Sequence, residues 1–286
     1  MGRSTPNKAL VAVFSLLLAL DVVAQPQHNS HNSSAVRPFR VALSAGLPHM
    51  YDLLRQSQLP RQEEYPGVAD TAGIDLNVLR ALQGVWLEDF DWKREEEELN
   101  SFKHFTTEIE GLTVHFIHER SSDPDAIPIL LNHGWPGSFL EFTPIIKSLT
   151  SSATTSDGRP VSFHVIAPSL PGFAFSSPPP ANWTIGDTAR MQHTLMADIL
   201  GYRQFAVHGT DWGSGPSYTL YADYSNATRA GHFTFLPFVA YTPDQLTAAN
   251  ISLQDTLEQQ EEQLSQGWRT TGNAYFLEQG TKASRA

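Results

Sequence analysis

The sequence predicts an α/β fold around a parallel sheet, and three stretches carry this prediction. Residues 127–131 form a continuous apolar run, as is typical of a strand buried on both faces, and residues 163–167 predict another buried strand. A third apolar run, at 205–207, leads into a glycine turn, and residues 217–222 beyond that turn are helical in character. Strand, turn and helix therefore follow one another in the order that an α/β fold requires.

The glycine turn after the third strand matches the elbow pattern G-x-S-x-G, except that an aspartate replaces the serine. The turn reads Gly209-Thr210-Asp211-Trp212-Gly213. Its two glycines allow the strained backbone and the close approach of helix to strand that an exposed nucleophile demands. A carboxylate is suited to displacing a leaving group from saturated carbon, and the product is an alkyl-enzyme ester. Asp211 is therefore a candidate nucleophile toward an epoxide or a halide. The alternative is an ordinary glycine turn with a helix-capping aspartate.

A second glycine loop follows the first predicted strand. It reads His133-Gly134-Trp135-Pro136-Gly137-Ser138. Glycines let backbone N–H groups turn toward a substrate, and Pro136 fixes one φ angle, so the donors are held before the reaction starts. Trp135 offers an apolar wall. The Asp211 elbow lies about 75 residues downstream, as the α/β-hydrolase topology expects, so we interpret this segment as an oxyanion-type loop. A simple strand-to-helix turn is the alternative for the loop alone.

A series of ordered motifs resembles the microsomal-type epoxide hydrolases, including their fungal members, from about Pro38 to the end of the chain. The motifs are Trp-Lys at 92–93, Glu-Leu-Asn at 98–100, Phe-Thr-Thr-Glu-Ile-Glu-Gly-Leu at 105–112, His-Gly-Trp-Pro-Gly-Ser-Phe-Leu-Glu-Phe at 133–142 and Ala-Pro-Ser-Leu-Pro-Gly-Phe-Ala-Phe-Ser at 167–176, followed by the elbow. The resemblance implies an α/β-hydrolase fold with an N-terminal meander. It also implies that Asp211 is the nucleophile and that the backbone of the His-Gly-Trp-Pro loop stabilises an oxyanion.

The same resemblance implies a proton donor. Tyr275 matches the first of two lid tyrosines that donate hydrogen bonds to the epoxide oxygen in this family. Ring opening creates an alkoxide, and a phenol with a pKa of about 10 can protonate it while staying uncharged at neutral pH. A buried structural tyrosine is the alternative interpretation of Tyr275.

The chain divides into five predicted segments. Residues 1–24 predict a signal peptide, because Arg3 and Lys8 precede an apolar run that ends in small residues. A linker at 25–37 leads to the epoxide hydrolase N-terminal region at 38–120. Residues 121–240 form the front part of the core, and 241–286 begin a helical lid. We expect a secreted, glycosylated protein; an uncleaved anchor in the endoplasmic reticulum membrane is the alternative.

Several smaller elements are expected within these segments. Apolar residues at 76, 79, 82, 85 and 86 have helical spacing, and the glutamates at 95–98 are most simply a solvated face. The pattern at 105–118 predicts a hairpin, so His115 and His118 need not be metal ligands, although a metal site is the alternative. Residues 187–200 predict a helix capped by Asp187, and 253–264 predict a lid helix.

The predicted sheet is incomplete, and we expect a C-terminally truncated chain. Hydrolysis of an alkyl ester requires a base such as histidine, oriented by a second carboxylate. The only histidine after Asp211 is His232, in an apolar run that predicts a strand, so we expect it to be structural. We therefore expect alkylation of Asp211 without efficient turnover. An unpaired sheet edge also predicts weak stability, aggregation or pairing with another copy.

Composition limits the partners. The net charge is −11, without a basic cluster, so nucleic acid and anionic lipid are poor partners. The chain has no cysteine, which excludes disulfides and thiol catalysis. We expect a small apolar epoxide and water as substrates, with no cofactor and no metal. Two other functions remain open: a dehalogenase, because Trp212 can hold a leaving halide, and a non-catalytic secreted binding protein.

Overall fold

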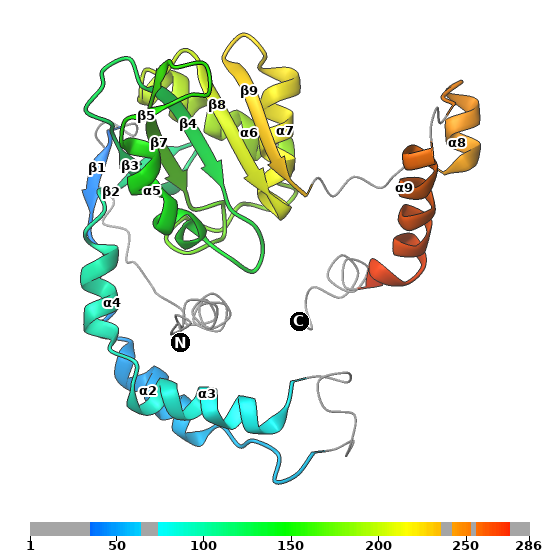
Figure 1. The fold of residues 1–286 in the computed structure, drawn as a ribbon. Coiled ribbons are helices and arrows are strands. Elements are labelled where there is room, and N and C mark those ends of the chain that lie inside the picture. The colour runs from blue at the N-terminus through cyan, green and yellow to red at the C-terminus, as the bar shows by residue number, and fades with distance from the viewer. Residues whose placement is uncertain (1–34, 64–73, 236–241, 253–255, 275–286) are drawn as a thin grey trace. The chain divides into compact units, whose positions relative to one another are not determined.

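The computed structural model describes residues 35–63, 74–235, 242–252 and 256–274 (Figure 1). The chain forms two compact units, Met1–Leu236 and Pro237–Ala286. The predicted signal peptide, most of the linker and Tyr275 lie outside the described residues.

The first unit contains a seven-stranded mixed sheet with the order β1-β2-β3-β7-β4-β8-β9. The strands are β1 Arg37–Phe39, β2 His104–Ile109, β3 Leu112–Glu119, β4 Ile127–Asn132, β7 Phe163–Pro168, β8 Phe205–Thr210 and β9 Thr228–Thr234. The first four in this order pair antiparallel, and β7, β4, β8 and β9 pair parallel. The predicted α/β fold with buried strands at 127–131 and 163–167 is confirmed. A separate two-stranded ribbon joins β5 Ala153–Thr154 and β6 Pro160–Val161.

The predicted hairpin is formed by β2 and β3. Ile109 pairs with Leu112, which leaves Glu110 and Gly111 as a two-residue turn. Both turn residues have positive φ, 52° and 82°, as a type I′ turn requires. Glycine adopts this conformation without steric cost.

Helices cover both faces of the sheet, and the side chains of neighbouring residues on one strand point to opposite faces. Leu130 and Ile166 belong to the cluster under α6 Ile185–His193 and α7 Ser214–Asp223, whereas Leu131 and Val165 belong to the cluster under α5 Thr143–Thr150. Figure 1 shows these helices on the two sides of the sheet. This alternation explains why apolar residues follow one another along the central parallel strands, as at 129–131 and 165–167.

The start of α6 corrects one prediction. Thr184, not Asp187, is the N-cap residue, and Asp187 takes the N3 position of a capping box with it. The Thr184 hydroxyl accepts from the Asp187 N–H, and the Asp187 carboxylate accepts from the Thr184 N–H. After His193 the helix continues as a π-helix, η4 Thr194–Ile199.

Among the described residues, three helices precede the hairpin: α2 Leu47–Gln56, α3 Leu76–Glu88 and α4 Trp92–Leu99. The helical spacing predicted at 76–86 is confirmed by α3, which Asp75 caps. The acidic run on α4 is only partly solvated, because Glu96 Oε2 accepts a hydrogen bond of 3.0 Å from the Leu43 N–H. Asn100 at the end of α4 exchanges two further hydrogen bonds with the Val41 backbone.

The described part of the second unit contains α8 Pro243–Ala248, α9 Thr256–Gly267 and a π-helical turn, η6 Trp268–Gly272. The predicted lid helix at 253–264 corresponds to α9 over its described part. Throughout the ranges that the structure describes, every helix is too short or too polar to span a bilayer.

A buried amide network supports the carboxyl ends of the central strands. Asn132, the last residue of β4, exchanges hydrogen bonds of 3.0 and 2.7 Å with Gln192 of α6. Its Nδ2 also donates to Ser217 Oγ of α7 at 2.8 Å. All three side chains are fully buried, so β4 is joined to both helices through groups that water does not reach.

Replacing Gln192 by leucine should therefore destabilise the fold. The substitution leaves the Asn132 amide without two partners in a dry interior, and the expected loss is about 1–3 kcal/mol of unfolding free energy. Urea denaturation measures it. The matched control is Gln204→Leu at an exposed position, where a change within about 0.5 kcal/mol is expected. Equal effects of the two substitutions would contradict the network.

Candidate active site

Asp211 stands at the tip of a sharp turn between β8 and α7. Its φ is 48°, in the left-handed region that residues other than glycine seldom adopt. A short 3₁₀ turn, η5 Asp211–Gly213, then leads into the helix. Backbone strain of this kind costs free energy and is concentrated at functional sites.

The two elbow glycines allow the strand and helix to approach. A Cβ on Gly213 would overlap the carbonyl oxygens of Asn132 and His133. A Cβ on Gly209 would lie 2.5 Å from the Gly213 carbonyl oxygen and 2.7 Å from Ser214 Cα. In both places the obstacle is backbone, which cannot rotate out of the way as a side chain can.

The loop after β4 meets this elbow directly. The Trp135 backbone N–H donates to Asp211 Oδ1 at 2.8 Å. A Cβ on Gly134 would lie 2.6 Å from Asp211 Cβ, so glycine is needed for this approach. The two loops meet because β4 and β8 are parallel neighbours, and ligand sites of α/β sheets form at the carboxyl ends of such strands.

His133 supports the loop from inside the protein. Its Nε2 accepts from the Leu170 N–H at 3.0 Å, so the ring proton lies on Nδ1, which donates to the Gly134 carbonyl at 3.0 Å. Burial lowers the pKa of His133 to about 4, which keeps the ring neutral. The Gly134 carbonyl and the Trp135 N–H belong to one peptide unit. The side chain therefore orients the very peptide whose N–H reaches Asp211.

Glu141 is a carboxyl group near the elbow that the sequence analysis did not single out. It lies on a 3₁₀ turn, η3 Phe139–Phe142, and its side chain folds back against Gly137. Its pKa is raised to about 7, mainly by burial; a hydrogen bond from the Gly134 N–H opposes the rise, and the charge of Asp211 contributes to it.

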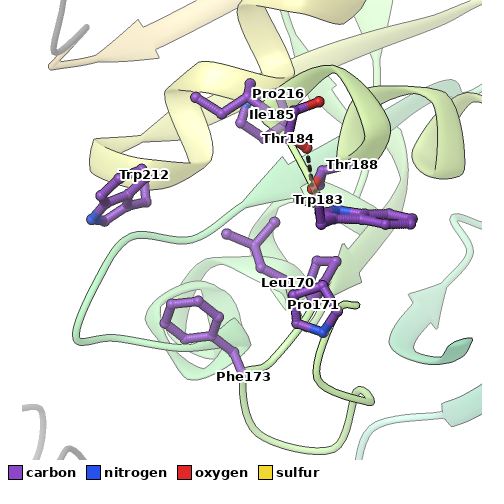
Figure 2. Close-up of a pocket in the computed structure, with 10 residues that line it drawn as sticks. Leu170, Pro171, Phe173, Trp183, Thr184, Ile185, Thr188, Trp212 and Pro216 are labelled. Atoms are coloured by element: carbon purple, nitrogen blue, oxygen red, sulfur yellow. Dashed lines mark hydrogen bonds between the residues drawn. The ribbon is translucent and has the colours of Figure 1, made fainter. Parts of the chain in front are cut away.

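An apolar pocket of about 180 Å³ opens beside the elbow. Its walls include the residue after the nucleophile candidate, the segment after β7 and the start of α6: Leu170, Pro171, Phe173, Pro179, Trp183, Thr184, Ile185, Thr188, Trp212 and Pro216. Figure 2 shows Leu170 between Trp212 and Trp183. Trp212, which lines the pocket, is 44% exposed, and Trp135 of the neighbouring loop is 41% exposed. The Trp135-Pro136 peptide is cis.

Several histidines of the sheet contact other side chains. His232 lies on β9, as predicted, with its Nδ1 2.8 Å from His208 Nδ1 of β8. His115 is buried between His104 and Ser169, with hydrogen bonds of 3.0 and 2.9 Å. Within the described residues, no group of three or more potential ligands is arranged to hold a metal ion.

Two family models match the chain. The model described as "Epoxide hydrolase N terminus" matches residues 36–142, and the model described as "alpha/beta hydrolase fold" matches residues 127–272, which is half of the chain. The chain belongs to the epoxide hydrolase family of the α/β-hydrolase fold. The predicted resemblance is thereby confirmed.

Relatives and solved structures agree with this assignment. Epoxide hydrolase 1 of Oryctolagus cuniculus is 37% identical over 188 residues, which cover 63% of this chain and 40% of the relative. The structure of Aspergillus niger epoxide hydrolase is 33% identical with a TM-score of 0.69, and the match covers 90% of this chain and 66% of that one. An enantioselective mutant of the Aspergillus niger enzyme has a TM-score of 0.70 at 35% identity, over 90% of this chain and 64% of that one. The chain spans about half the length of the curated relatives it matches.

Replacing Gly213 by alanine should disrupt the elbow. The added methyl group has no space between two backbone carbonyl groups, so we expect a loss of more than about 2 kcal/mol or failure to fold. Thermal unfolding followed by circular dichroism measures it. Gly84→Ala in α3 is the control, because nothing lies within 4 Å of its Cβ, and it should stabilise by up to about 1 kcal/mol.

The neutral state of His133 predicts a pH dependence. The folded pKa of about 4 lies below the ordinary 6.5, so the unfolded chain binds the proton first as pH falls. The contribution to stability is complete above pH 6.5 and is lost as pH falls through about 4, on the order of 3 kcal/mol in all. Imidazole ¹⁵N shifts should show the Nδ1-protonated neutral ring at pH 6. A protonated ring at that pH would contradict the assignment.

Proposed function

We propose that this protein opens epoxides with Asp211 as the nucleophile. The observation that carries the proposal is the Trp135 N–H bond to Asp211 Oδ1 at a strained elbow beside an apolar pocket. One carboxylate oxygen is held by this bond, which leaves Oδ2 to attack. A bond forms between Oδ2 and a ring carbon, the ring C–O bond breaks, and the epoxide oxygen takes up a proton.

The second step uses the same loop. In the ester, Oδ1 is the carbonyl oxygen, and attack by water on the carbonyl carbon places negative charge on it. The Trp135 N–H already points at this atom, so it stabilises the oxyanion without rearrangement. The proposed role of the loop therefore belongs to its backbone, while His133 fixes the orientation of that backbone from behind.

The pocket supports a small apolar epoxide as the substrate. Its walls are aromatic and aliphatic side chains, with Trp212 next to the nucleophile in the chain. A substituent of a terminal epoxide can be buried there while the ring faces Asp211. Tyr275 is proposed, on the family resemblance, as the proton donor to the opened ring. We also propose secretion, on the leader pattern at residues 1–24.

Release of the product requires a general base. In a polypeptide of these 286 residues the single histidine after Asp211 is His232, and its ring is paired with His208 on the sheet. We propose that such a polypeptide is alkylated once and hydrolyses the ester slowly.

Intact-mass spectrometry after incubation with 1,2-epoxyhexane should show the addition of one epoxide molecule. The adduct should map to Asp211 in the tryptic peptide of residues 204–229. Asp211→Asn should abolish it, whereas Asp223→Asn, which removes an exposed carboxylate in the same peptide, should not. A folded wild-type protein that shows no epoxide adduct would contradict the proposal. If 1-bromohexane reacted in place of the epoxide, the dehalogenase reading would replace it.

A further inference from the structure

Glu141 is a partly buried carboxyl group that the proposed chemistry leaves unused. Its side chain turns back over the oxyanion-type loop: a Cβ on Gly137 would overlap Glu141 Oε1, and it would lie 2.7 Å from Cδ. Only glycine at 137 leaves room for this carboxyl group. The position of Glu141 is therefore set by the loop itself rather than by solvent exposure.

Consecutive backbone groups of the loop are each held by a different side chain. The Gly134 N–H donates to the Glu141 carboxyl group, and the Gly134 carbonyl accepts from His133 Nδ1. The next N–H, that of Trp135, donates to Asp211. Gly134 is buried, so loss of the Glu141 acceptor would leave the Gly134 N–H without a partner. The backbone at Gly134 could then rotate.

Glu141 also lies within the electrostatic influence of the nucleophile. The negative charge of Asp211 acts on Glu141, and the Gly134 backbone is packed against Asp211. The histidine on the other side of the loop, His133, is neutral at pH 7. Within the described residues, Asp211 is the charged group that acts on Glu141 most directly.

We propose that Glu141 is a positioning residue that holds the Gly134 N–H and thereby keeps the Trp135 N–H aimed at Asp211. The proposal rests on the function proposed above. Gly134 connects the two contacts, because its N–H is held by Glu141 and its carbonyl belongs to the same peptide unit as the Trp135 N–H.

The first test needs no epoxide. Labelling with ¹³C-carbonyl histidine and ¹⁵N-glycine selects two amides, Gly134 and Gly209, because the sequence contains two His-Gly pairs. The Gly209 signal is identified by its disappearance in His208→Gln. The Gly134 signal should titrate with a midpoint near 7, as expected for the Glu141 carboxyl group. Asp211→Asn should lower this midpoint, because a like charge is removed.

Two variants define the outcomes of the titration. Glu141→Gln should abolish the Gly134 titration, and Glu98→Gln, an exposed carboxylate on α4, should leave it unchanged. Circular dichroism and the melting temperature confirm that each variant is folded. A Gly134 signal that does not titrate near pH 7, or a midpoint that Asp211→Asn leaves unmoved, would overturn the proposal whether or not the protein reacts with epoxides.

The second test measures the rate of alkylation by 1,2-epoxyhexane. Glu141→Leu removes the acceptor and should slow the alkylation of Asp211 by about tenfold or more. Glu141→Gln retains an acceptor oxygen and should restore the rate to within about threefold, with a flatter pH profile. A merely structural role would lower the melting temperature of both variants and leave the pH profile unchanged. Absence of an adduct on the wild type counts against the proposed function, whereas wild-type rates in Glu141→Leu count against Glu141 alone.

Discussion

The hydrogen bond from the Trp135 N–H to Asp211 Oδ1 joins the two loops on which the site depends. It exists because the sheet places β4 beside β8 in parallel, with Asn132 opposite Gly209. The loops leave the same edge of the sheet a few residues later. The register decides which residues meet, and the glycines at 134, 209 and 213 decide how closely they meet. A side chain at any of these three positions would separate the donor from the carboxylate.

Behind this contact lies a layer of buried polar groups that fixes the backbone. His133 holds the Gly134 carbonyl, and the amide of Asn132 joins the end of β4 to α6 and α7. Each group has its partners, so none incurs the cost of an unsatisfied buried dipole. This explains how a loop near solvent can keep a defined N–H direction: its orientation is set from the interior, where low dielectric strengthens each hydrogen bond.

Local features of the site could be predicted from the sequence, and features that depend on distant partners could not. The elbow and the oxyanion-type loop are short patterns of glycine with one reactive residue, so their form is encoded where they occur. The Thr184 cap was missed although its signal, threonine three residues before an acidic residue, was present. His133 is positioned by the Leu170 amide, 37 residues away, and no local pattern indicates which nitrogen carries its proton. Glu141 looks like any glutamate on a polar turn until the chain folds it over Gly137 and toward Asp211.

A second carboxyl group beside a nucleophilic carboxylate would repel it if both were always ionised. Like charges at close range disfavour one another, and a permanent negative charge at Glu141 would oppose the oxyanion that forms at Asp211. The raised pKa of Glu141 reduces this repulsion, because burial disfavours the ionised form of the carboxyl group. The carboxyl group can therefore hold the Gly134 N–H while placing less negative charge beside the atom on which the proposed oxyanion forms.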